Sequence, residues 1–117
     1  GAVHSCAHAL GTVADMHHGL ANGIMIDHVM RFNADAAGEK MAELARVCGA
    51  GSTEGDFVSW LGRLKREIGI PARLGEAGVS AQQVPALVDV AVKDTCHLTN
   101  PKPCTADDFG RIFANAI

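Results

Sequence analysis

Aromatic residues are scarce in this chain of 117 residues, which contains no tyrosine, one tryptophan and four phenylalanines. Sheets favour aromatic and β-branched side chains, so this scarcity argues against a fold built from strands. The sequence is instead rich in alanine, the residue with the highest helix propensity. We therefore expect an all-α protein.

Neither sign of charge is in large excess. Ten basic and 13 acidic side chains give a formal net charge of −3, and the two signs are interleaved along the chain. A protein that binds nucleic acid concentrates lysine and arginine on one face, and no such concentration exists here. The sequence therefore argues against a nucleic-acid partner.

Long apolar runs are missing as well. A helix that spans a bilayer needs about 20 consecutive apolar residues, and Asp15, Asp27 and Arg31 interrupt the opening segment. No secretory leader is recognisable. We expect a soluble, cytoplasmic protein without a membrane partner.

The remaining bulk properties suit one folded domain. A length of 117 residues, with 48% hydrophobic and 20% charged residues, is enough for a single core. The four cysteines form neither a CxxC pair nor a zinc-finger spacing. We expect each of them to be a small buried hydrophobe in a reducing compartment; they are Cys6, Cys48, Cys96 and Cys104.

Apolar residues recur with helical spacing in six segments. These are residues 1–14, 18–32, 36–47, 53–68, 80–93 and 105–113. Asn33 and Asp35 separate the second segment from the third. Thr53 or Ser52 is expected to cap the fourth segment, and Thr105 the sixth. Residues 1–117 are therefore predicted to form one multi-helix bundle of about six helices. In the fourth segment the solvent side is expected to hold Arg63, Lys65, Arg66 and Glu67.

Histidine carries the only chemical signal. Five of the six histidines fall within the first 28 residues, at positions 4, 8, 17, 18 and 28. On a helix, His4 and His8 lie one turn apart on one face. A second helix that starts near His18 could bring a third imidazole to the same point. Imidazole is the commonest transition-metal ligand and titrates near neutral pH, so this spacing favours a metal or proton-transfer site. Hydrogen-bonded core histidines are the alternative.

The runs GAVHSCAHALG and HHGLANGIMIDHVMRFN resemble the C-terminal helical domain of the iron-containing (group III) alcohol dehydrogenases. The segments EKMAELARVCG, GIPARLGEAGV and NPKPCTADDFGRIFANAI fit the same family, so the resemblance covers essentially all 117 residues. The branch that it resembles includes lactaldehyde and propanediol oxidoreductases. The resemblance implies a dehydroquinate synthase-like architecture, in which residues 1–117 form the metal-binding, substrate-side domain.

The resemblance also implies roles for three histidines. In the family, an aspartate and a histidine from preceding sequence hold the metal together with two histidines that match His4 and His18. His8 matches a histidine beside the nicotinamide and the substrate, so we expect it to relay a proton, or else to hydrogen-bond the ligands. Gly19 and Asn22 either serve this site or pack the helix. Imidazole and carboxylate ligands suit Fe²⁺ and Zn²⁺ alike.

The other histidines are expected to lie outside the site. His17 stands where relatives often carry proline, and we expect it to be exposed to solvent. His28 follows Asp27, which also replaces a usual proline, and is expected to be structural. His97 is expected to be a surface or packing residue.

Parts of the family's machinery are missing from this chain. The segment GAGS at residues 49–52 follows a predicted helix, so it does not fit the strand–turn–helix context of a dinucleotide-binding loop. We expect the N-terminal α/β domain that binds NAD(P) to be absent, and the isolated chain to be inactive. The parent would then be a metal-dependent, NAD(P)-linked alcohol dehydrogenase acting on a small alcohol or aldehyde. A face stripped of its partner domain would favour a homo-oligomer. The alternative is a stand-alone helical binding or assembly module without catalysis.

Overall fold

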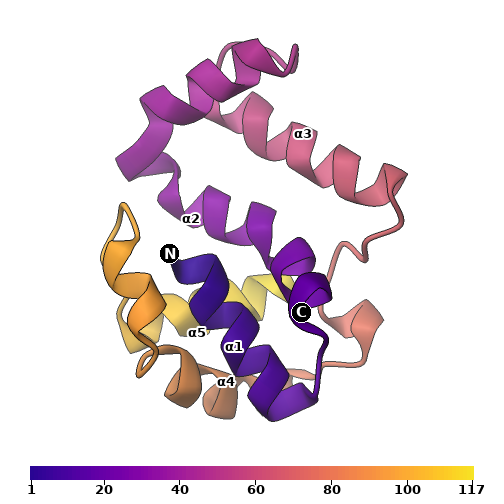
Figure 1. The fold of residues 1–117 in the computed structure, drawn as a ribbon, viewed down its shortest axis with the longest axis vertical. Coiled ribbons are helices and arrows are strands. Elements are labelled where there is room, and N and C mark those ends of the chain that lie inside the picture. Colours follow the sequence, from indigo (N-terminus) through magenta and orange to yellow (C-terminus); the bar gives the residue numbers. More distant parts are fainter.

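The computed structural model describes all residues 1–117 and contains helices but no strand (Figure 1). The α-helices are α1 (Ala2–Ala14), α2 (His18–Val47), α3 (Glu54–Glu67), α4 (Val84–Ala91) and α5 (Ala106–Ala116). Three short 3₁₀ helices, η1 (Gly75–Ala77), η2 (Ala81–Gln83) and η3 (Thr95–Thr99), lie in the connections. The all-α prediction is confirmed. No helix combines the length and the apolar character needed to cross a bilayer.

Helix α2 is the longest helix and is bent at Ala37, where φ of −126° and ψ of 19° depart from helical values. The predicted separation of two helices at Asn33 to Asp35 therefore corresponds to a bend two residues further on, and because the two parts form one continuous element, five α-helices replace the expected six. Asn33 does not break the helix because its buried amide exchanges hydrogen bonds of 2.7 and 3.1 Å with Asn100. A distant partner thus takes the side chain that would otherwise compete for the local backbone.

Threonine caps begin α3 and α5, as the sequence predicted. Thr53 Oγ1 accepts a hydrogen bond from the backbone amide of Asp56 at 3.1 Å, and the Asp56 carboxylate accepts one from the amide of Thr53 at 2.9 Å. Thr105 and Asp108 repeat this arrangement at 3.2 and 2.9 Å. These reciprocal bonds satisfy amide donors that the start of a helix leaves free.

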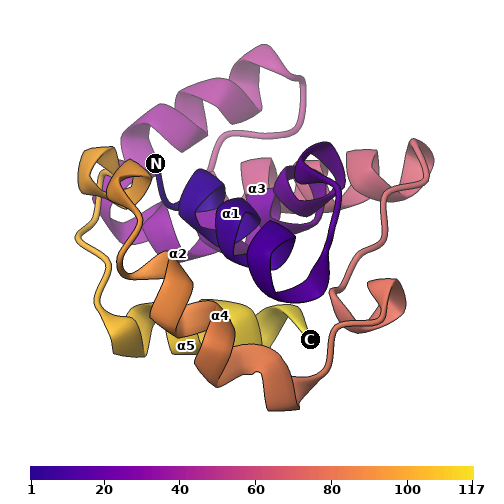
Figure 2. The same ribbon diagram turned by 60° about the horizontal axis from the view of Figure 1, so that its bottom comes forward.

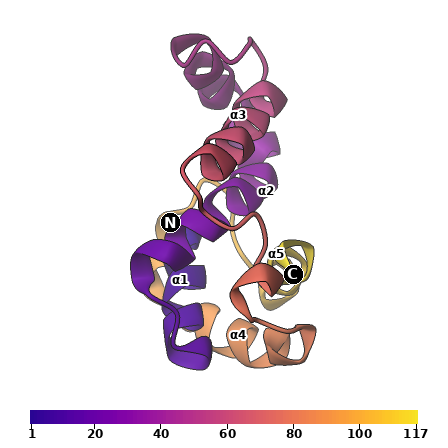
Figure 3. The same cartoon turned by 90° about the vertical axis from the view of Figure 1, so that its right-hand side faces the viewer.

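Two apolar cores hold the helices together. The larger core lies among α1, the first half of α2, α4 and α5, and its largest fully buried hydrophobic side chains include Phe109, Phe113, Leu10, Ile24, Met25, Leu74 and Leu87. The smaller core lies between α3 and the part of α2 beyond the bend, and contains Met41, Ala45, Phe57, Val58 and Leu61. Figure 3 shows α3 at the opposite end of the molecule from α4 and α5. Helix α2 therefore belongs to both cores.

A buried lysine joins α3 to α2. Lys65 is only 3% exposed and donates hydrogen bonds to the carboxylate of Asp27 and to the carbonyl oxygen of Ile24, the latter at 2.7 Å. The prediction that Lys65 faces solvent is wrong, because Asp27 on α2 offers its amine an ionic partner inside the protein. The next contact along this seam is the hydrogen bond from His28 Nε2 to the carbonyl oxygen of Ala72 at 3.1 Å.

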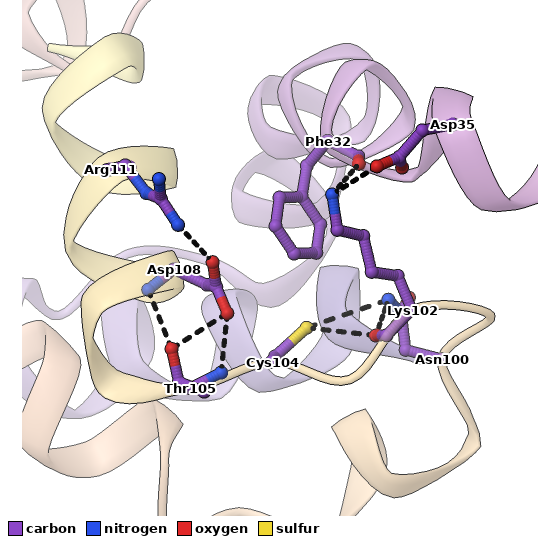
Figure 4. A network of polar contacts seen from close by, with 8 residues as sticks. All are labelled: Phe32, Asp35, Asn100, Lys102, Cys104, Thr105, Asp108 and Arg111. Carbon is purple, nitrogen blue, oxygen red and sulfur yellow. Dashed lines mark hydrogen bonds and ion pairs between the residues drawn. The ribbon is translucent and has the colours of Figure 1, made fainter.

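Polar contacts fix the loop that precedes α5 (Figure 4). The amine of Lys102 lies 2.7 Å from the Asp35 carboxylate and 4.4 Å from the centre of the Phe32 ring. Cys104 approaches the side-chain amide of Asn100 within the loop. These contacts attach residues 100–104 to α2, while α5 continues from the Thr105 cap.

All four thiols are free. Cys6 and Cys104 are buried, as predicted, and Cys96 is partly buried. The prediction is wrong for Cys48, which is exposed just after the last turn of α2.

Candidate metal and catalytic site

Three histidines meet where α1 and α2 join. His4 and His8 lie one turn apart on α1, and His18 is the first residue of α2. The chain turns back at Asp15, which adopts a left-handed φ of 51°, and the ring of His17 caps the start of α2. The ring centroids of His4 and His18 are 5.4 Å apart, those of His8 and His18 5.3 Å, and those of His4 and His8 6.2 Å. All three side chains are exposed on this surface.

The spacing of these rings fits a shared metal ion. Two imidazoles that bind one ion at 2.0–2.1 Å in tetrahedral or octahedral geometry have ring centroids about 4.5 to 5.5 Å apart. The pair formed by His4 and His18 lies in this range, as does the pair formed by His8 and His18. Imidazole nitrogen is a ligand that both Fe²⁺ and Zn²⁺ accept. Two imidazoles on one ion would leave coordination positions free for further ligands or substrate.

Asp94, an aspartate that the sequence did not single out, contacts His8. Asp94 lies just ahead of η3, and helix α1 contacts both η3 and α2 (Figure 2). Its carboxylate is 2.7 Å from His8 Nδ1, and it accepts hydrogen bonds from Ser5 Oγ at 2.7 Å and the Cys96 amide at 2.8 Å. Burial works against ionisation, but these hydrogen bonds outweigh it and hold the pKa of Asp94 well below its usual range. The carboxyl is therefore ionised at neutral pH.

Cys96 is the second neighbour that the sequence did not place at the site. The ligand-type atoms of His8, Asp94 and Cys96 all lie within 4.8 Å of one another. Hydrogen bonding to Asp94 is the main cause that raises the pKa of the Cys96 thiol, with a smaller contribution from burial. The only local signal in the sequence was the aspartate directly ahead of a short helical turn, a common cap. Such a cap does not reveal a contact with a histidine 86 residues away.

Asn22 borders the site on α2, one turn after His18. Its Nδ2 donates to the carbonyl oxygen of His18 at 3.0 Å, whereas its Oδ1 is buried without a hydrogen-bond partner. A mainly apolar hollow of about 560 Å³ runs past Asn22 and His4. A β-carbon on Gly19 would lie 3.4 Å from the ring of His17, an ordinary contact distance. Asn22 thus lines this hollow, and Gly19 lies in the first turn of α2.

The other histidines lie outside the cluster. His17 is exposed and accepts a hydrogen bond from the amide of Gly19 at 3.2 Å. His28 packs at the seam of α2 and α3, where burial is the main cause that lowers its pKa. His97 contacts the carbonyl oxygen of Val92 at 3.2 Å and meets the Phe109 ring edge-on.

Comparisons with known proteins point to one family. Residues 1–117 match the model of the Fe-containing alcohol dehydrogenase family, C-terminal. The chain is 39% identical over 124 aligned positions to lactaldehyde reductase of Escherichia coli (strain K12), covering 99% of this chain and 32% of that protein. It is 34% identical to 1,3-propanediol dehydrogenase of Klebsiella pneumoniae, covering all of this chain and 32% of that protein. It is 33% identical to NAD-dependent methanol dehydrogenase of Bacillus methanolicus, with the same coverage.

Solved structures give the same picture. The fold superposes on a 1,3-propanediol oxidoreductase with a TM-score of 0.93 at 35% identity, covering 100% of this chain and 32% of that one. An alcohol dehydrogenase from Oenococcus oeni gives a TM-score of 0.91 at 29% identity, again over 100% of this chain and 32% of that one. The chain therefore spans about a third of the length of these relatives.

Proposed function

Because the chain belongs to the iron-containing alcohol dehydrogenase family and forms its C-terminal domain, as its sequence predicted, we propose that it supplies the helical half of a metal-dependent site. At this site a small alcohol and its aldehyde would be interconverted by hydride transfer to or from NAD(P). The observation that supports this proposal is the convergence of His4, His8 and His18 at the junction of α1 and α2.

His4 and His18 are the proposed metal ligands. Their centroid separation of 5.4 Å suits two imidazoles on one ion. A divalent ion held there supplies Lewis acidity, which lowers the pKa of an alcohol and stabilises the alkoxide from which a hydride can leave. Fe²⁺ and Zn²⁺ both satisfy this donor set.

His8 is the proposed proton relay. Its ring lies 5.3 Å from that of His18, centre to centre, and its side chain is 43% exposed. During oxidation, the ring would take the hydroxyl proton of the alcohol and pass it to solvent, while the hydride goes to the nicotinamide. During reduction of an aldehyde, the ring would return a proton to the oxygen.

The rest of the site is proposed to come from another domain. An aspartate and a further histidine would complete the metal shell, and an α/β domain would bind NAD(P). Residues 1–117 alone would then bind metal weakly and turn over no substrate. The names of the relatives suggest short alcohols and aldehydes as the substrate class.

Substitution of the two ligands tests this function. In purified protein that carries residues 1–117 together with the NAD(P)-binding domain, His4→Ala and His18→Ala are each expected to lower bound iron or zinc at least about tenfold and to abolish turnover. Metal would be measured by atomic emission, and turnover with NAD⁺ and 1,3-propanediol or methanol. His17→Ala is the matched control, since His17 neighbours the site but only caps α2. Unchanged metal content in both variants would refute the ligand assignment.

A further inference from the structure

We propose that Asp94 is a positioning residue, which holds His8 in one orientation and one tautomer for proton transfer. This inference rests on the function proposed above for His8. It assigns a role to a carboxylate that lies 86 residues further along the chain and that meets α1 only in the folded protein.

Both oxygens of Asp94 are already hydrogen-bonded. Oδ2 faces His8 Nδ1 at 2.7 Å, and Oδ1 accepts from Ser5 Oγ and from the Cys96 amide. An ionised carboxylate only accepts hydrogen bonds, so Nδ1 of His8 must carry the proton that joins the two groups. In the neutral imidazole, Nε2 then has the free lone pair. His8 is thereby kept in the tautomer that can take a proton at Nε2.

The Asp94 side chain is less exposed to solvent than the His8 ring that it orients. The Asp94 side chain is 19% exposed, against 43% for His8, and Ser5 is fully buried. Ser5 and His8 are three residues apart, so they share one face of α1. The carboxylate thus bridges two side chains of α1 while the amide of Cys96 fixes it to η3. A ring held in this way is restrained from rotating.

Hydrogen bonding explains this cluster better than a separate metal site. His8, Asp94 and Cys96 are close enough to share an ion, but an ion would have to displace the proton between His8 and Asp94. The thiolate is the form of cysteine that binds metal, and the contact with Asp94 raises the pKa of the Cys96 thiol. The arrangement is therefore that of a carboxylate that orients an imidazole.

The Asp94→Asn variant tests the assignment. The asparagine amide donates where the carboxylate accepted, so His8 should move its proton to Nε2 and lose its acceptor. In protein that carries residues 1–117 together with the NAD(P)-binding domain, we expect kcat for alcohol oxidation to fall by about 100-fold, with bound metal and KM little changed. The ¹⁵N chemical shifts of the His8 ring, measured in Zn²⁺-loaded protein and assigned with His8→Gln, should show Nδ1 protonated in the wild type and Nε2 protonated in the variant.

The matched control is Asp89→Asn. Asp89 is a 67% exposed carboxylate on α4 that pairs only with Lys93, so kcat and the His8 shifts should stay at wild-type values. The wild-type tautomer is read without depending on the folding of Asp94→Asn. An unprotonated Nδ1 on His8 of the wild-type protein would overturn the proposal.

Three other outcomes would also count against the role of Asp94. An active wild type whose Asp94→Asn variant keeps its rate would refute the positioning role alone. Loss of metal in that variant would make Asp94 a support for a ligand, or part of a second ion site, and would overturn the proposal. A wild type without metal-dependent turnover would refute the proposed function and the role of Asp94 with it.

Discussion

Lys65 is buried, whereas lysine side chains are normally exposed to solvent. A buried lysine is costly unless its amine is paired and hydrogen-bonded. Here the amine meets Asp27, itself 8% exposed, and the carbonyl oxygen of Ile24. The two charges compensate each other, so removal of either should be far more harmful than removal of both.

Replacing Lys65 by methionine should destabilise the protein by about 3–5 kcal/mol, because the carboxylate of Asp27 is left buried without a counter-charge. The double variant Lys65→Met with Asp27→Leu should recover most of that loss. Urea unfolding followed by the fluorescence of Trp60, the single tryptophan on α3, measures both.

Lys93→Met is the control for this comparison. It breaks a solvent-exposed pair with Asp89 and should cost less than about 1 kcal/mol. Equal losses in Lys65→Met and in the double variant would show that packing, and not charge, holds this seam.

At the residue scale, sequence reasoning found groups that share one stretch of chain. His4 and His8 lie four residues apart, so helical spacing was enough to predict that they share a face, whereas the place of His18 beside them came from the family resemblance. Asp94 and Lys65 were missed because their partners lie 86 and 38 residues away. No local period encodes which distant carboxylate a histidine or a lysine will reach.

Among the helices, α3 depends most clearly on its first turn. Its stripe of buried side chains is short, and the other positions of the helix are largely solvated. The cap formed by Thr53 and Asp56 satisfies amides that would otherwise be open at this end. Loss of the cap should therefore fray the helix from its start.

Thr53→Ala is expected to lower the free energy of unfolding by about 1 kcal/mol. Ser59→Ala on the exposed middle of the same helix is the control, and should be neutral or slightly stabilising because alanine favours helix. Circular dichroism during urea unfolding would report both. A loss in Ser59→Ala equal to that in Thr53→Ala would mean that the cap contributes nothing specific.

At the element scale, the starts of helices were more predictable than their interruptions. A cap depends on residues three positions apart, as in Thr53 with Asp56 and Thr105 with Asp108, so the sequence contains all that is needed. The expected break at Asn33 failed because Asn100, 67 residues away, takes up its side chain. The bend occurs at Ala37 instead, directly before Gly38, whose low helix propensity is a local mark of it.

For the whole molecule, the division into two cores separates the site from α3. The histidine cluster stands on α1 and on the start of α2, both in the larger core. The five buried residues of the smaller core come from α3 and the far part of α2, and Ile26, Met30 and Ala34 of the first half of α2 pack against their edge. Damage to the smaller core should therefore leave the site intact.

Phe57→Ala tests this separation. We expect a loss of about 3–5 kcal/mol for the local opening of the smaller core, because a nearly buried ring is removed. Hydrogen exchange should quicken in α3 and in residues 41–47, while the amides of α1 keep their protection. Bound metal should stay at the wild-type level. Faster exchange throughout α1 would show that the two cores open as one unit.

The family and the all-α fold were both predictable for the molecule as a whole, because the resemblance runs through essentially the full chain. The division into two cores was not, since it depends on which distant side chains pack against each part of α2. The hollow beside His4 and Asn22 was equally out of reach, because distant segments form its walls.

The amide of Asn100 has a consequence for the speed of folding. It joins the start of α1, through the amide of Ala2 at 3.2 Å, to Asn33 in the middle of α2, across sequence separations of 98 and 67 residues. Closing loops of that length costs entropy, so we expect these bonds to form only after the helices have docked. Contacts made that late leave the folding rate almost unchanged and act on the unfolding rate. The hydrogen bonds of Asn100 are thus expected to slow unfolding, and so to lengthen the lifetime of the native state.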